Sequence, residues 1–239
     1  LSSSSAASDV YKRQLYLKNK KLSIQIYKKY LTSLCKYLKN IGININTIPV
    51  LDVLRHNTSK VIGTRGFSNK REIVKKLGKI TVRLCHENKI ISVIKHIPGH
   101  GCAVTDSHHK MPKVNLSHKD LNDTDYFPFK SNPAKLAMTA HILYKKIDPL
   151  NVATFSKKII NEIIRKKIGY NGIIMSDDIS MKALKYDLVT NAKKSLNAGC
   201  NLVLYCAGNI NDNFKLIKTI PYIDKFTSKK TSEIYKILR

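Results

Sequence analysis

A regular alternation of strand-like and helix-like segments, from residue 43 to the end, most constrains what this chain can fold into. Apolar runs of strand length predict strands over residues 43–53, 89–96, 135–141, 172–175 and 201–206, and a helical pattern follows each of them. Strands that alternate with helices pair in parallel through helical crossovers. The pattern therefore predicts an α/β fold with five parallel strands. Five strands are too few to close an eight-stranded barrel, so the sheet is open or the chain is a piece of something larger.

The first predicted helix covers residues 15–40. Its apolar residues recur at helical spacing and would form one buried face, made by Leu22, Ile26, Tyr30, Leu34 and Leu38. Gly42 would end this helix, because glycine tolerates the left-handed backbone conformation found after a last helical turn.

Serines mark the starts of three later helices, because a serine hydroxyl accepts hydrogen bonds from the free N–H groups of a first helical turn. Ser68 precedes a helix predicted over residues 70–88, Ser117 precedes one over 118–123, and Ser156 precedes one over 157–168. Asp120 stands where it can complete a capping box with Ser117. Further helices are expected before Gly199 and over residues 211–219 and 228–238.

Residues 1–14 differ in composition from everything that follows. Four consecutive serines and several small residues are typical of a linker or a non-native leader. We therefore expect one partial domain over residues 15–239, with its native beginning missing.

The chain is strongly basic, with 43 Lys and Arg against 16 Asp and Glu and a formal net charge of +27. Such a charge favours anionic ligands by electrostatic steering, and nucleic acid or an anionic lipid surface are the partners it suggests first. However, the excess lysines are spread along the whole chain, and no nucleic-acid-binding motif accompanies them. A compositional bias is therefore the preferred interpretation, and we expect no nucleic-acid and no membrane partner.

The five cysteines form no CxxC pair, which indicates reduced thiols of a cytoplasmic protein. No apolar run reaches the roughly 20 residues that span a bilayer, and no secretory signal is visible.

Polar residues stand at the end of every predicted strand, where α/β folds place their chemistry. They are Asp52, the pair Lys95 and His96, His141, the pair Asp177 and Asp178, and Cys206. Convergence of several such residues indicates a site. For His141 alone, a hydrogen-bonded core histidine is an equally good interpretation.

Asp177 and Asp178 are adjacent, so on an extended backbone only one of them can face the site. A carboxylate next to cationic groups is suited to be a nucleophile or to stabilise a developing positive charge. The other carboxylate would cap the next helix or pair with a base.

Asp106 and His108 are two residues apart on a loop, so the carboxylate could orient the imidazole for general acid and base work. A solvated loop with surface histidines is the alternative that this spacing alone favours. The histidines could also bind a metal, but none of the usual zinc spacings is present, and we expect no metal and no cofactor.

Several motifs follow one another along the chain, and they include Lys95-His96-Ile97-Pro98-Gly99-His100-Gly101, Asp106-Ser107-His108, Met138-Thr139-Ala140-His141 and Ser176-Asp177-Asp178-Ile179-Ser180-Met181. Taken together, and in this order over residues 15–217, they resemble the bacterial β-N-acetylhexosaminidases of glycoside hydrolase family 3. The Asp-Ser-His loop is typical of the N-acetylhexosaminidase branch and separates it from the β-glucosidases.

The resemblance implies a (β/α)₈ barrel, here incomplete with about five of its eight βα units. It also implies retaining hydrolysis of terminal N-acetylhexosamine through a covalent glycosyl-enzyme, on peptidoglycan fragments such as GlcNAc-1,6-anhydroMurNAc. By the same resemblance Asp177 would be the nucleophile, and His108 the acid/base with Asp106 as its partner. Arg65, Lys95 and His96 would hold the sugar. We expect a monomer that binds a small amino-sugar substrate.

The chain departs from the family at its beginning, since the family's first three strands and an Asp-x-Glu-Gly-Gly motif have no counterpart. Part of the binding site and three-eighths of the barrel are therefore absent, and residues 1–239 are expected to be inactive by themselves because an open barrel exposes strand edges and leaves its core unfilled. Another family-3 exo-glycosidase, such as a β-glucosidase, and a non-catalytic basic nucleic-acid-binding protein are the alternatives.

Overall fold

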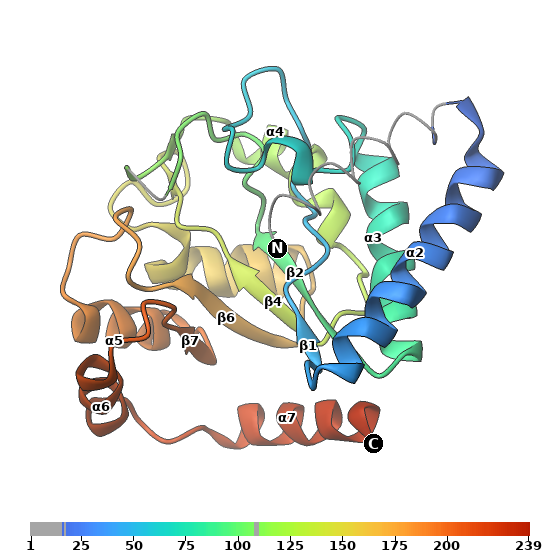
Figure 1. Cartoon of the computed structure of the whole chain (residues 1–239). Helices are drawn as coiled ribbons and strands as arrows, with labels where there is room; N and C mark the ends of the chain where they lie inside the picture. The colour runs from blue at the N-terminus through green and yellow to red at the C-terminus, as the bar shows by residue number, and fades with distance from the viewer. Residues whose placement is uncertain (1–15, 17, 108–109) are drawn as a thin grey trace.

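The computed structural model describes residues 16, 18–107 and 110–239; the leader predicted over residues 1–14 lies outside the described residues. Five parallel strands form its main sheet, in sequence order. They are β1 (Ile45–Asn46), β2 (Ile91–Ile97), β4 (Leu136–Thr139), β6 (Ile173–Asp178) and β7 (Leu202–Leu204). The sheet curls into a half-barrel, which confirms the predicted α/β class and the five-stranded incomplete barrel (Figure 1).

Helices surround this sheet. In Figure 1, α2 (Lys20–Asn40) and α3 (Arg71–Glu87) lie beyond β1, α5 (Leu188–Ala198) and α6 (Ile210–Thr219) lie near β7, and α7 (Lys225–Leu238) runs along its lower side. The remaining helices are α4 (His118–Asp123), the π-helix η4 (Ile159–Lys167) and three short 3₁₀ turns at Gly63–Arg65, Phe127–Phe129 and Ala153–Phe155. None of the helices in the described part of the chain could span a membrane.

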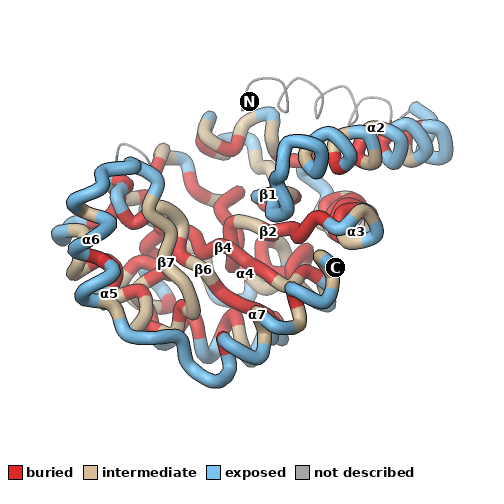
Figure 2. The backbone as a smooth tube through the Cα atoms, turned by 60° about the horizontal axis from the view of Figure 1, so that its bottom comes forward, coloured by how far each residue is buried: buried red, intermediate tan, exposed pale blue. Residues whose placement is uncertain are grey.

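The two faces of the sheet are used differently, as the alternation of side chains along a strand requires. Ile94, Ala137 and Ile174 belong to the main core, to which α2, α3 and η4 each contribute buried apolar residues. Ile91, Val93 and Ile173 point the other way and pack with Ile234 of α7. The central strands are consequently among the most buried parts of the chain (Figure 2).

The predicted face of the first helix is wrong in part, because Tyr30 and Leu38 do pack against buried clusters but Leu22 and Ile26 do not. The buried stripe of α2 is Ser23, Tyr27, Leu31 and Cys35, whereas Leu22 and Ile26 are 44% and 45% exposed. The reason lies in α3: Tyr27 Oη hydrogen-bonds Thr81 Oγ1 at 2.6 Å, and Cys35 Sγ contacts Cys85 Sγ at 3.8 Å. The partner helix selects a stripe one residue away from the one that hydropathy suggests.

The first predicted strand is also much shorter than expected. The N–H of Ile48 donates to Asn46 O at 2.9 Å, and Pro49 has no N–H to donate, so the ladder stops after Asn46. Residues 49–53 nevertheless run beside β2, since Leu51 N donates to Lys95 O at 2.7 Å.

The three serines that were predicted to cap helices have different roles. Ser117 forms the expected capping box with Asp120, and Ser156 Oγ accepts the N–H of Ile159 at 3.1 Å. Ser68 is not the N-cap of α3; Lys70 holds that position, and Ser68 Oγ accepts the N–H of Lys70. A two-stranded parallel sheet, β3 (Lys113–Val114) with β5 (Leu143–Tyr144), was not predicted, because two-residue strands leave no period in the sequence.

Candidate active site

Residues from three separate segments line one pocket at the carboxyl ends of β2 and β6. The pocket has a volume of about 120 Å³ and is lined by Val61, Ile62, Arg65, Lys95, His96, His100, Ser107 and Asp177. Strand alternation explains two of these positions: Lys95 follows Val93 by two residues, and Asp177 follows Met175 by two, so both side chains leave the strands on the same face. Four of the six predicted site residues, Arg65, Lys95, His96 and Asp177, thus meet in one place.

The other two predicted site residues belong to the loop after β2. His108 lies outside the described residues. Asp106 is half-buried, and the N–H of Lys110 donates to its backbone oxygen at 3.1 Å. Its neighbour Ser107 is buried and lines the pocket, so this loop reaches the site at Ser107.

Asp177 lies among groups that stabilise its negative charge. Burial by itself would raise the pKa of this carboxyl, but electrostatic interactions with His96 and His141 and the N–H of Asp178 outweigh it and hold the pKa below its usual value. Lys95 adds to the same effect. An ionised carboxylate at a strand end is therefore stabilised in this pocket.

Asp178, by contrast, organises the backbone. Its Oδ1 accepts the N–H of Ser180 at 3.0 Å and the N–H of Cys206 at 3.2 Å, and the Ser180 hydroxyl donates to both carboxylate oxygens. The prediction that only one of the two adjacent aspartates faces the site is confirmed.

Two cations approach the pocket from different elements. Burial lowers the pKa of Lys95, the charge of Asp177 opposes this, and Arg65 adds to the lowering. Arg65 is held at the end of its 3₁₀ turn because Nε and Nη2 both donate to Val61 O, with Nε at 2.9 Å. These bonds to a backbone oxygen hold the guanidinium beside the pocket, which Arg65 lines.

Asp52 stands at the end of a predicted strand, and the sequence predicts no role for it. It is fully buried and accepts three hydrogen bonds. Oδ1 accepts the N–H of His96 at 3.2 Å and the N–H of His100 at 2.6 Å, while Oδ2 lies 2.7 Å from His96 Nδ1. Burial opposes its ionisation, but the electrostatic interaction with His96 and these hydrogen bonds keep its pKa below the usual value.

His100 belongs to the motif over residues 95–101 and had no predicted role of its own, yet it lines the pocket. Its side chain is buried, and neither ring nitrogen has a hydrogen-bond partner among the described residues. Burial lowers the pKa of His100 to about 4, so the ring is neutral at physiological pH.

His141 is a hydrogen-bonded core histidine. Its sequence position alone had left this interpretation and a functional one equally good. Nδ1 lies 2.7 Å from Thr154 Oγ1, and Nε2 lies 3.0 Å from Asp178 O. Because a carbonyl oxygen can only accept, the proton is on Nε2.

The cysteines and the candidate metal ligands give simple results. All five cysteines are free, as predicted. No group of three or more His, Cys, Asp or Glu side chains within residues 18–107 and 110–239 is placed to hold a metal ion.

Comparison with known sequences places the chain next to glycosidases. Residues 17–231 match the glycosyl hydrolase family 3 N terminal domain. A β-hexosaminidase from Nitrosomonas eutropha is 34% identical over 194 residues, which cover 79% of this chain and 55% of that protein. One from Alkalilimnicola ehrlichii is 37% identical over 170 residues, covering 69% and 48%. The chain thus spans about half the length of these curated relatives.

Solved structures agree with the sequence matches. Native NagZ from Neisseria gonorrhoeae superposes with a TM-score of 0.84 at 27% identity, over 93% of this chain and 65% of that one. A family 3 β-N-acetylglucosaminidase from Paenibacillus superposes with a TM-score of 0.79 at 26% identity, over 90% and 43%.

Proposed function

Because this chain belongs to glycosyl hydrolase family 3, we propose that it carries the catalytic site of a retaining exo-β-N-acetylglucosaminidase. The observation that carries the proposal is the meeting of Asp177, Lys95, His96 and Arg65 in one pocket. β-Hexosaminidases among its relatives and β-N-acetylglucosaminidases among its structural neighbours support the amino-sugar specificity. Terminal N-acetylglucosamine of peptidoglycan fragments is the proposed substrate, and the basic chain would attract such anionic fragments.

Asp177 is proposed as the nucleophile. Its carboxylate attacks the anomeric carbon and forms an ester bond to the sugar, while the bond from that carbon to the leaving oxygen breaks. This step needs an ionised carboxylate, and the lowered pKa of Asp177 supports that state. Lys95 and Arg65 would hold sugar hydroxyls, since both side chains reach the same pocket.

His108 is proposed as the acid/base, with Asp106 as its partner; both roles remain predictions from the sequence. As an imidazolium His108 would protonate the leaving oxygen. As a neutral imidazole it would then take a proton from water, whose oxygen attacks the anomeric carbon and releases Asp177. An imidazole can alternate between these states near neutral pH.

Hydrolysis of p-nitrophenyl β-N-acetylglucosaminide by the complete gene product tests the proposal. Asp177→Asn should lower kcat/KM on the order of 10⁴-fold or more, because the nucleophile is lost while the shape of the side chain is kept. Asp123→Asn, on the exposed end of α4, is the matched control and should retain full activity. Near-normal activity of the Asp177→Asn variant would remove the nucleophile assignment.

A second measurement separates the acid/base role. His108→Ala should slow substrates with poor leaving groups more than activated aryl glycosides, because acid assistance matters less when the leaving group is already good. Equal losses on both classes would argue against the role of His108.

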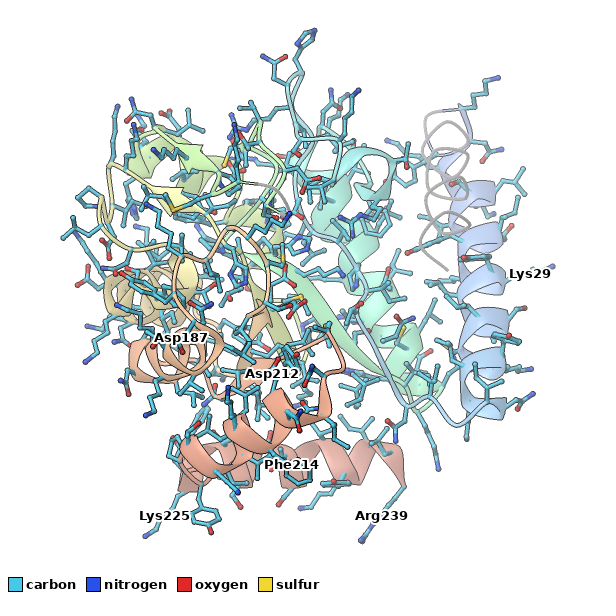
Figure 3. The ribbon with its side chains drawn as sticks, turned by 60° about the vertical axis from the view of Figure 1, so that its left-hand side comes forward. Lys29, Asp187, Asp212, Phe214, Lys225 and Arg239 are labelled. Atoms are coloured by element: carbon cyan, nitrogen blue, oxygen red, sulfur yellow. The ribbon has the colours of Figure 1, made fainter. Side chains whose placement is uncertain are left out.

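The same assays decide between the alternatives. Preference for p-nitrophenyl β-glucoside would favour a β-glucosidase of the same family. Retention on DNA at high salt would favour a nucleic-acid-binding protein. Of the exposed basic residues, Lys29 lies on α2, whereas Lys225 and Arg239 lie at opposite ends of α7, and all three point outward, so these three form no single binding surface (Figure 3).

A further inference from the structure

We propose that Asp52 is a positioning residue: it fixes the proton of His96 on Nδ1, so that Nε2 presents a hydrogen-bond acceptor to a sugar hydroxyl in the pocket. The inference rests on the proposed function for its ligand. Its structural part rests on the contacts of Asp52 and His96.

The first step concerns the proton between the two side chains. Asp52 Oδ2 lies 2.7 Å from His96 Nδ1, and Asp52 is fully buried. An ionised carboxylate has no hydrogen to donate, so the bond exists only if Nδ1 carries the proton. In the neutral imidazole Nε2 must then carry the lone pair.

The second step concerns the geometry that holds Asp52 itself. Oδ1 accepts two backbone N–H groups, from His96 at 3.2 Å and from His100 at 2.6 Å. The carboxylate therefore cannot rotate without breaking bonds to both ends of the segment 96–100. Oδ1 therefore faces the two backbone N–H groups, and Oδ2 faces the imidazole.

The third step concerns what the two cations and the proposed nucleophile cannot offer to a sugar hydroxyl. Lys95 and Arg65 only donate hydrogen bonds, and the Asp177 carboxylate is reserved for the anomeric carbon in the proposed reaction. A sugar hydroxyl donates one hydrogen as well as accepting. His96 lines the pocket, and its hydrogen bonds with the described residues are made by the backbone N–H and by Nδ1. An acceptor at Nε2 gives the hydroxyl hydrogen a partner that the cations cannot supply.

Asp52→Asn is a sharp test, because the amide is nearly the same shape and changes one property. The amide oxygen can keep both backbone N–H bonds, which places the NH₂ group where Oδ2 faced His96 Nδ1. Two donors cannot share that contact, so His96 must move its proton to Nε2. The variant should therefore fold normally and convert Nε2 from an acceptor into a donor.

Long-range ¹⁵N–¹H correlation spectra of the histidine rings report the tautomer directly, and the wild-type chain alone already tests the proposal. We expect the Nδ1–H form for His96, identified by the signal lost in His96→Gln. His141 is an internal standard with the opposite Nε2–H form, because its Nε2 faces a carbonyl oxygen. In Asp52→Asn the His96 pattern should reverse while the His141 pattern stays.

Asp148→Asn is the matched control variant, since Asp148 also organises a loop by accepting the N–H groups of Leu150 and Asn151 but lies outside the pocket lining. It should leave the His96 spectrum unchanged. A wild-type His96 in the Nε2–H form, a ring protonated on both nitrogens throughout the pH range, or an unchanged tautomer in Asp52→Asn would each overturn the inference.

Kinetics of the complete gene product test the consequence for the sugar. Asp52→Asn should lower kcat/KM for p-nitrophenyl β-N-acetylglucosaminide on the order of 10- to 100-fold, with a raised KM, because a buried donor then faces the place of an acceptor. Full activity in a variant whose tautomer has reversed would refute the positioning role. A wild-type protein without glycosidase activity would instead refute the proposed function, and the tautomer spectra would still test the role of Asp52.

Discussion

Gly101→Ala is a substitution whose cost the structure determines directly. A Cβ atom at residue 101 would lie 1.9 Å from Val53 O, 2.7 Å from Val53 C and 3.0 Å from Val53 N. All three are backbone atoms, which cannot rotate away as a side chain can. Since nonbonded heavy atoms rest about 3.5–4.0 Å apart, the two segments must separate by more than about 1 Å.

That separation also breaks the hydrogen bonds that join the same two segments. Thr58 Oγ1 donates to Gly101 O at 2.7 Å, and Ser59 N donates to Ala103 O at 2.8 Å. Overpacking costs about 1–3 kcal/mol, and each lost hydrogen bond costs about 1 kcal/mol. We therefore expect Gly101→Ala to lower the free energy of unfolding by about 3–5 kcal/mol.

Urea unfolding followed by far-ultraviolet circular dichroism measures this loss. Gly66→Ala is the matched control: its φ of −77° suits any residue, and its Cβ would meet only the Leu54 side chain, at 2.6 Å. That side chain can turn aside, so the control should lose less than about 1 kcal/mol. The steric reasoning would be refuted if Gly101→Ala stayed within about 0.5 kcal/mol of the wild type, or if both variants lost the same amount.

Three further predictions concern single contacts. Tyr144→Phe removes the hydroxyl that donates to Gly99 O at 2.6 Å and leaves that carbonyl without this donor, so urea unfolding should show a loss of about 1–2 kcal/mol, and none for the fully exposed Tyr222→Phe. Ser117→Ala removes the capping box of α4 and should cost about 1 kcal/mol in the same assay, where an unchanged midpoint would contradict the cap. Burial lowers the pKa of His100 from 6.5 to about 4, so between these pH values the unfolded chain binds a proton that the folded protein does not. Stability should fall as the pH decreases through this window, and His100→Gln should make the fall shallower by about one proton; an unchanged slope would show that His100 is not responsible.

The fold could be predicted because its signals are local. A strand with apolar residues throughout and a helix with a 3.6-residue period each appear within about 10 residues of sequence, and the alternation of the two requires parallel pairing. The strand ends that this pattern located, at Lys95, His96 and Asp177, do meet in one pocket. Ser117 with Asp120 was predictable for the same reason, since a capping box needs residues only three apart.

The sequence-based predictions were wrong where contacts with a distant segment determine the local structure. α2 has apolar residues on two neighbouring stripes, and only its packing on α3, through Tyr27 and Thr81, selects the stripe that is buried. Two-residue strands such as β3 and β5 form because the tertiary fold brings their segments together, so no pattern in the local sequence predicts them.

The amino-acid sequence by itself determined the α/β class, the parallel direction of five strands and which strand ends carry polar residues, because periodicity and capping act over a few neighbouring residues. Only the tertiary structure decided what those polar residues do. Asp52 stands 44 positions before His96, and their bond exists because residues 49–53 run beside β2. Asp177 and Asp178 are chemically identical neighbours in the sequence; strand alternation turns one toward Lys95 and His96 and the other toward Ser180 and Cys206.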